Sequence, residues 1–263
     1  MLGTAKEARQ DMEQSLVDAE YERRRVEQLN ISEGKLTGYD CSVCLNKGYI
    51  YYLSKDDAVI ARECECTAVR RTMKRFVKSG LRDLIDECTF ENFRTDSPWQ
   101  KHMKELAQAF VADFNGNWFF CGGQVGAGKT HICAAIVCEL VKHGIAAQYM
   151  LWRDNAVFLK AIVTDAAKYG DAVNEFKKAE ILFIDDFFKT GRGESPTGAD
   201  IQLAFEILNY RYNVRESVTI ISSELLIDDI LLFDEGTGSR IFERSRKHCV
   251  AIERDRAKNF RLR

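Results

Sequence analysis

The sequence has little proline, no long apolar run and almost no net charge. Two prolines in 263 residues exclude a proline-rich linker. No segment approaches the roughly 18 consecutive apolar residues of a membrane span. The N-terminal residues also lack the apolar stretch of a signal peptide. We therefore expect a cytoplasmic protein that does not bind membranes.

The near balance of charge excludes a chain coated uniformly with basic residues. Lys and Arg total 38 and Asp and Glu total 40, for a net charge of -2. Local basic patches remain compatible with this balance. Apolar residues make up 46% of the chain, enough for a packed core. Because cytoplasmic thiols stay reduced, we do not expect the nine cysteines to form a disulfide framework.

Changes in composition along the chain predict four segments. The last of them alternates helical patterns with five short apolar strands, at 118–121, 147–152, 181–184, 218–222 and 249–252. Buried strands separated by helices indicate an α/β fold, with a five-stranded parallel sheet covered on both faces. The predicted segments are an N-terminal helix at 1–38, a cysteine-rich module at 39–68, a basic helix with a linker at 69–98, and the α/β domain at 99–263.

The strongest motif is a glycine-rich loop that fits G-x-x-x-x-G-K-[ST] between a predicted strand and a predicted helix. Its backbone N–H groups can surround an anion, and the following helix adds its positive dipole end. Lys129 would contact the β- and γ-phosphates of ATP, and Thr130 would bind Mg²⁺. The loop residues are Gly123, Gln124, Val125, Gly126, Ala127, Gly128, Lys129 and Thr130.

Two acids end the apolar strand at 181–184, at the carboxyl edge where parallel sheets bind ligands. We assign Asp185 to Mg²⁺ and Asp186 to orienting the attacking water. Asp186 is one methylene shorter than the glutamate usual there in related ATPases, so hydrolysis is expected to be slow. The alternative is that both acids only cap the next turn.

Two further polar groups follow later strands. A side chain within 222–224 lies where it could sense the γ-phosphate, although a plain strand end is an equal alternative. Arg240, on a predicted helix at 238–246, could project into the nucleotide site of a neighbouring subunit as an arginine finger. Residues 240–263 hold nine basic and three acidic residues, so this end could also meet a nucleic-acid backbone.

Two cysteine pairs flank a predicted β-hairpin. Cys41 and Cys44 have the common C-x-x-C spacing, and Cys64 and Cys66 follow the second strand. Four thiolates on two turns can enclose a tetrahedral structural Zn²⁺, which would also stabilise so small a module. An iron–sulfur cluster and unliganded thiols are the alternatives. The other five cysteines are interpreted as core residues.

Aromatic and basic residues are interleaved in two stretches, a pattern typical of single-stranded nucleic-acid binding. The alternative, favoured for Phe158 and Phe187, is that the rings lie in the core. The residues are Trp152, Phe158, Lys160, Lys168, Phe187, Phe188, Lys189 and Arg192.

Taken together, these features resemble the AAA+ helicase loaders of the DnaC/DnaI type, especially phage-encoded ones. The resemblance covers about residues 39–263. It rests on the cysteine-flanked hairpin, the basic helix, the glycine-rich loop, and the motifs CTFENF at 88–93, FIDDF at 183–187, ISSEL at 221–225, GSRIFERS at 238–245 and NFR at 259–261.

The resemblance implies an AAA+ ATPase that lacks the usual helical lid and forms homo-oligomers with ATP. Its ATPase domain would bind single-stranded DNA, and its N-terminal part would bind the replicative helicase. Arg240 matches the arginine finger and Arg261 the second sensor. Glu224 stands where many family members have Asn and would repel a γ-phosphate, which argues against a direct sensor role. Open alternatives are a transposase-helper ATPase of the IstB type, a small-molecule kinase and a non-catalytic adaptor of the helicase.

Overall fold

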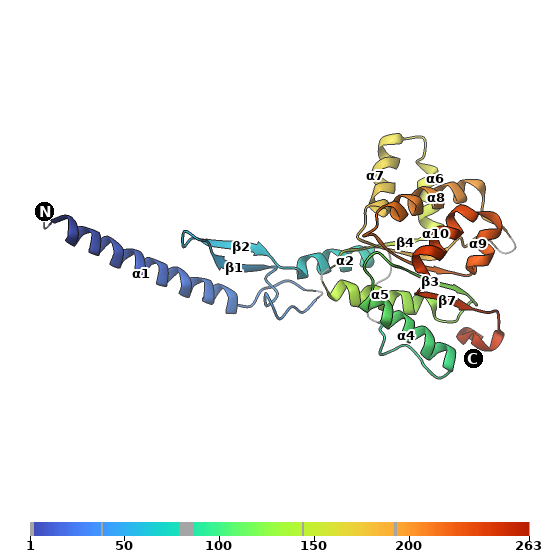
Figure 1. The fold of residues 1–263 in the computed structure, drawn as a ribbon, viewed down its shortest axis with the longest axis horizontal. Coiled ribbons are helices and arrows are strands. Elements are labelled where there is room, and N and C mark those ends of the chain that lie inside the picture. Colours follow the sequence, from blue (N-terminus) through green and yellow to red (C-terminus); the bar gives the residue numbers. More distant parts are fainter. Residues whose placement is uncertain (1–2, 38, 79–86, 144, 192–193, 263) are drawn as a thin grey trace. The chain divides into compact units, whose positions relative to one another are not determined.

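The computed structural model describes residues 3–37, 39–78, 87–143, 145–191 and 194–262 (Figure 1). It divides into two compact units, Met1–Arg70 and Arg71–Arg263. Within the described ranges, no helix is long and apolar enough to cross a membrane. The basic helix expected within 69–98 would end at Gly80, and that residue lies outside the described residues.

The first unit joins a long helix to a β-hairpin. Helix α1 (Gly3–Ile31) agrees with the helix expected there. Strands β1 (Tyr49–Leu53) and β2 (Val59–Glu63) pair antiparallel. The Asn30 side chain donates to the Tyr51 carbonyl (2.8 Å) and accepts from the Tyr51 N–H (3.0 Å). This double hydrogen bond fixes the end of α1 against the hairpin.

The second unit contains five parallel strands, as the sequence predicted, and the structure gives their order as β4-β5-β6-β3-β7. All side chains of β3 and β6 are buried, which is typical of parallel sheets covered on both faces. Because the strands are parallel, their carboxyl ends meet at one edge. The strands are β3 (Trp118–Gly123), β4 (Ala147–Leu151), β5 (Ile181–Phe187), β6 (Val218–Ser223) and β7 (Cys249–Ile252).

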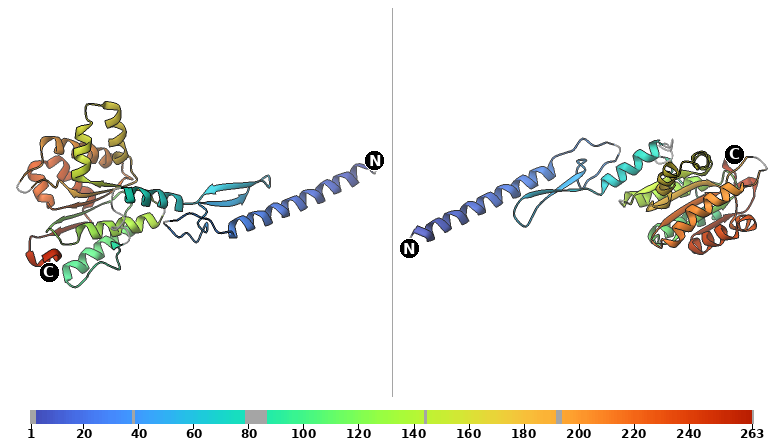
Figure 2. Two further views of the ribbon diagram at one scale, coloured as in Figure 1. Left: turned by 180° about the vertical axis from the view of Figure 1, so that it is seen from behind. Right: turned by 90° about the horizontal axis from the view of Figure 1, so that it is seen from above.

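Helices cover both faces of this sheet. Helices α4 (Pro98–Ala112) and α5 (Lys129–Lys142) lie on one face, and the helices between β4 and β7 lie on the other (Figures 1 and 2). Helix α2 (Cys66–Lys78) precedes α4 in the chain, and two short 3₁₀ turns, η1 (Arg256–Lys258) and η2 (Phe260–Leu262), follow β7. The opposite-face helices are α6 (Trp152–Ala161), α7 (Ala166–Lys177), α8 (Gly198–Asn213), α9 (Ile227–Phe233) and α10 (Glu235–Ser245).

Two helix predictions are wrong. The helical pattern after the strand at 147–152 predicts one helix at 154–169, but the structure has two, α6 and α7. Asp165 begins the second helix by accepting the Lys168 N–H (3.1 Å). Helix α9 was not predicted, and α10 begins at Glu235, three residues before the expected start. Asp234 caps α10 by accepting the Thr237 N–H (3.2 Å), a signal of the same kind as that of Asp165.

Arg211 on α8 is fully buried, and its guanidinium donates hydrogen bonds to the beginning of β6 and to the segment before β5. Burial, with a smaller contribution from Arg244, lowers its pKa to about 9. Its guanidinium therefore needs every acceptor that it has, since an unpaired buried charge is costly. Those acceptors are the Thr219 hydroxyl and the carbonyls of Phe176, Lys177, Ala179 and Val218, at 2.6–3.2 Å.

Replacing Arg211 with Met should lower the free energy of unfolding by about 2–4 kcal/mol, because buried carbonyls lose their donor. Urea unfolding followed by tryptophan fluorescence measures this, since all three tryptophans lie in the second unit. The matched control is Arg215→Met at an exposed arginine, expected within about 0.5 kcal/mol of the unsubstituted chain. Equal stability of the two variants would contradict the role given to Arg211.

Candidate functional site

The glycine-rich loop lies between β3 and α5, where the motif predicted it. Gly126 and Gly128 have φ angles of 72° and 86°, left-handed values that other residues rarely adopt. Gly128 is the residue before α5, so the positive end of that helix faces the loop. The Lys129 ammonium donates to the carbonyls of Gly123 (2.8 Å) and Gln124 (2.7 Å). Burial lowers the Lys129 pKa.

The chain after β7 packs directly on this loop. The Phe260 N–H donates to the Gly126 carbonyl (3.0 Å). A Cβ atom at Gly126 would lie 2.0 Å from the Asn259 side-chain oxygen, so another residue there would displace the Asn259 side chain and would also have to adopt a left-handed φ. These contacts bring Arg261 to the same cavity as Lys129. The role of Arg261 as a second sensor stays a prediction.

A β-bulge places both predicted acids at the loop. Ile184 pairs with Ile221 and Phe187 with Ser223, so β5 has one more residue than β6 between these pairs. Asp186 has a φ of 53° at this irregularity. In a regular strand adjacent side chains point to opposite faces, but here Asp185 and Asp186 line one cavity. The bulge therefore makes a paired-carboxylate site possible.

Asp185 is buried, and hydroxyl groups from three elements hold it. Thr130 of α5 donates to Asp185 Oδ1 (2.9 Å), as does Ser222 of β6, and Tyr149 of β4 donates to Oδ2 (3.1 Å). Burial raises the Asp185 pKa, and these hydrogen bonds oppose the rise. Thr130 and Asp185 together offer the oxygen ligands that Mg²⁺ prefers, so they fit the predicted ion.

Asp186 and Glu224 share one cation. The Lys189 ammonium contacts Asp186 Oδ2 (2.8 Å) and Glu224 Oε1 (3.1 Å). The hydroxyl groups at the end of β6 face inward to other partners: Ser222 to Asp185, and Ser223 to the Phe187 carbonyl (2.8 Å). Of the polar residues at 222–224, only Glu224 lines the cavity beside the loop.

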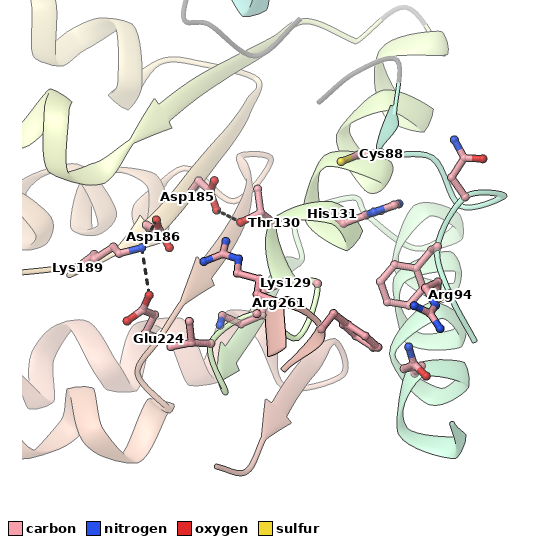
Figure 3. A pocket seen from close by; sticks show the side chains of 17 residues that line it. Cys88, Arg94, Lys129, Thr130, His131, Asp185, Asp186, Lys189, Glu224 and Arg261 are labelled. Carbon is pink, nitrogen blue, oxygen red and sulfur yellow. Dashed lines mark hydrogen bonds and ion pairs between the residues drawn. The ribbon is translucent and has the colours of Figure 1, made fainter. Parts of the chain in front are cut away.

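The acids and the loop enclose a cavity of about 580 Å³, a size that suits a nucleotide. Figure 3 shows the acids, Lys189 and Glu224 on one side of it, and Arg94 and His131 on the other. His131 bonds the Thr89 carbonyl (2.9 Å) and packs edge-on against Phe93 (5.3 Å between ring centres). The second wall was not assigned from the sequence, and consists of Cys88, Asn92, Phe93, Arg94, Gln100, His131 and Phe260.

Arg240 lies outside this cavity. Its guanidinium contacts the rings of Phe205 (4.9 Å) and Tyr212 (5.5 Å) and donates to the Gly236 carbonyl (2.7 Å). The Tyr212 hydroxyl in turn donates to Glu243 (2.7 Å). Arg240 is therefore held near the surface on α10, away from the loop of its own chain.

The predicted DNA-stacking residues separate into two groups. Trp152, Phe187 and Phe188 are at most 2% exposed and pack against one another, so they are core. The DNA-stacking role considered for Trp152 and Phe188 is therefore wrong, and the core position favoured for Phe187 is confirmed. Phe158 is 47% exposed, although its ring was expected in the core. Lys160 pairs with Asp200 (2.6 Å). Lys168 is exposed, and Arg192 lies outside the described residues.

The four cysteines of the first unit form one buried cluster, as predicted. Their sulfur atoms all lie within 4.8 Å of one another, with Cys41 and Cys64 at 3.9 Å and Cys44 and Cys66 at 3.4 Å. A tetrahedral Zn²⁺ with Zn–S bonds of about 2.3 Å needs sulfur separations of about 3.8 Å. The geometry therefore fits a closed zinc site.

Polar groups around the cluster hold its two turns. The Gly48 N–H donates to the Cys44 sulfur (3.3 Å). Burial raises the Cys44 pKa, but this bond and the neighbouring thiols outweigh it and lower the value to about 7. Arg70 joins the turns by donating to Asn46 (2.7 Å), which accepts the Cys41 N–H (3.0 Å).

The five other cysteines lie apart from this cluster. Cys121 and Cys133 are completely buried, as expected of core residues, and Cys138 and Cys249 are half-buried. Cys88 is also buried but lines the nucleotide-sized cavity. The sequence did not indicate this position, because no second cysteine lies near Cys88 in the chain.

One family model and several curated proteins match this chain. The model of the family described as IstB-like ATP binding protein matches residues 46–263. Phage-like element PBSX protein XkdC of Bacillus subtilis is 30% identical over 233 residues, covering 84% of this chain and 85% of XkdC. Replicative helicase loader DnaC of Escherichia coli is 30% identical over 132 residues, covering 49% of this chain and 53% of DnaC. The match to DnaC thus spans about half of either protein.

Two solved structures share the fold of the α/β domain. The crystal structure of the DnaC helicase loader aligns with a TM-score of 0.54 at 22% identity, over 62% of this chain and 97% of that one. The crystal structure of DnaI aligns with a TM-score of 0.53 at 22% identity, over 65% and 93%.

Purified protein should contain about one zinc per chain, and Cys41→Ser should lose most of it, because three thiolates and a hydroxyl bind zinc more weakly than four thiolates. Elemental analysis after gel filtration measures the content. Cys138→Ser, outside the cluster, is the control and should keep its zinc. Full zinc content in Cys41→Ser would refute the site.

Proposed function

The chain belongs to the IstB-like ATP-binding protein family, and from that premise we propose that it is an ATP-dependent helicase loader in DNA replication. The observation that carries this proposal is the cavity that joins the glycine-rich loop, two acids of β5 and Arg261. The similarity of 132 residues to a replicative helicase loader supports a role in helicase loading. We also propose that the protein acts in the cytoplasm.

In this proposal the cavity binds and hydrolyses ATP to ADP and phosphate. The loop N–H groups and the Lys129 ammonium bind the phosphates. Thr130 and Asp185 would hold Mg²⁺, which neutralises the negative charge that develops on the phosphates. Asp186 orients the attacking water, and Arg261 approaches the nucleotide from the segment after β7.

Arg240 acts on a neighbouring subunit. Arg240 does not line the cavity of its own chain and is half-buried on α10, which supports a role in trans. The rings of Phe205 and Tyr212 restrict the side chain, so less conformational entropy is lost when it meets a phosphate. ATP would thereby link subunits into a homo-oligomer.

The two units have separate partners in this proposal. The first unit, with its zinc-bound hairpin, binds the replicative helicase. The second unit binds single-stranded DNA, for which Phe158 and Lys168 supply an exposed ring and an exposed cation. The basic residues of 240–263 supply further phosphate contacts, so DNA affinity should fall as salt rises.

A transposase-helper ATPase of the IstB type is the second candidate. The description of the matching family model favours it, because that model covers the same ATP site without specifying a helicase. The two candidates share the cavity and differ in the macromolecule bound.

Lys129→Ala should abolish ATP binding, because the loop loses the ammonium that neutralises the phosphates. The same variant should fail to retain a replicative helicase on an affinity column in the presence of ATP, whereas the unsubstituted chain retains it. A candidate transposase on a parallel column is the comparison. Retention of the transposase instead of the helicase would contradict the loader assignment.

Arg240→Ala should bind ATP normally but hydrolyse it about a hundredfold more slowly or worse, because charge on the transferring phosphoryl is no longer neutralised. Mixing it with Lys129→Ala should restore turnover, since one variant keeps the loop and the other keeps the finger. Steady-state phosphate release measures both effects. If mixing restores nothing, Arg240 does not act in trans.

A further inference from the structure

Lys189 is fixed in place by the turn that follows β5. Its backbone N–H donates to the Asp186 carbonyl (2.9 Å), which closes the turn. Phe188, within the turn, has a φ of 58° and is buried against Trp152. The buried ring holds the backbone of the turn to the core, and the Lys189 side chain lines the edge of the cavity.

The ammonium of Lys189 joins the ends of two strands. It contacts Asp186 at the end of β5 and Glu224 just after β6. All three side chains line the same cavity as Lys129 and Thr130, and Figure 3 shows Lys189 between the two acids. Among the cations that the structure describes there, Lys189 is the one held by both strand ends.

The Lys189 ammonium is charged but only loosely held. Burial lowers its pKa, and the hydrogen bonds that it donates to Asp186 and Glu224 raise the pKa by more. The side chains of Lys189 and Glu224 are 35% and 33% exposed, so solvent weakens their attraction. A second cavity of about 630 Å³ borders both residues, which leaves the side chain room to turn.

Glu224 presents a difficulty that this pair resolves. A carboxylate at the end of β6 repels a phosphate, yet the residue lines the cavity beside the loop. Paired with Lys189 it is neutralised. A triphosphate carries more negative charge near these strand ends than a diphosphate does, and can compete with one carboxylate for the ammonium.

We propose that Lys189 is the γ-phosphate sensor of this chain, and that its ammonium moves from Glu224 to the γ-phosphate of ATP and returns to Glu224 with ADP. This inference rests on the proposed ATP site. Glu224 is then the resting partner of the sensor, and the ion pair reports which nucleotide is bound. Asp186 stays within reach of the same ammonium, so sensing and water orientation are joined at one residue.

The test is the ratio of ATP to ADP affinity, measured by equilibrium binding to the full chain with Mg²⁺. Lys189→Met should lower the ATP preference about tenfold, through weaker ATP binding at unchanged ADP binding, because one charge-assisted hydrogen bond is lost. Glu224→Gln should raise the preference several-fold, because the ammonium loses its competing partner. Lys177→Met is the control, since Lys177 is paired with Glu206 (2.6 Å) outside the cavity.

An unchanged ratio of ATP to ADP affinity in Lys189→Met would overturn the sensor assignment. If the ratio is unchanged because both affinities fall equally, Lys189 has a structural role. Because each protein supplies both affinities, partial unfolding cancels from the ratio. If Lys129→Ala binds ATP as well as the unsubstituted chain, the ATP site itself is wrong. If only the Lys189→Met ratio fails to change, the ATP site stands and the sensor falls alone.

Discussion

The second unit depends on how one buried carboxylate is satisfied. Asp185 is buried at the carboxyl edge of the sheet, where an unpaired charge would be costly. Hydroxyl groups from α5, β4 and β6 reach it together only if these elements stand in one register. Because the Asp185 carboxylate needs these hydrogen bonds, the glycine-rich loop is aligned with the ends of the strands. A site for a phosphate and a divalent cation results from the same alignment.

Much of this arrangement could be predicted from the sequence. Strands that are wholly apolar and end in glycine or aspartate indicate both the sheet and its functional edge, because parallel strands share that edge. The cysteine spacing likewise indicated the cluster, since short turns limit how far apart the sulfur atoms can be. These features depend on local patterns, which a single sequence contains.

Other features depend on tertiary contacts and were missed or wrong. No residue type marks the bulge at Asp186, because its φ is imposed by pairing with β6. Trp152 and Phe188 belong to sequence stretches with the aromatic and basic pattern of a DNA-binding surface. In the fold, α6 and the turn after β5 bury the two rings together. The wall around Arg94 comes from a segment without periodicity, so only the fold places it at the cavity.

The close approach of Asn259 to Gly126 has a mechanical consequence. The Asn259 side chain lies against Gly126, and the Phe260 N–H donates to the Gly126 carbonyl, so the loop and the segment after β7 are coupled. When the loop adjusts to a nucleotide, Asn259 must follow, and Phe260 and Arg261 move with it. The segment after β7 therefore transmits a movement of the phosphate-binding loop to Arg261.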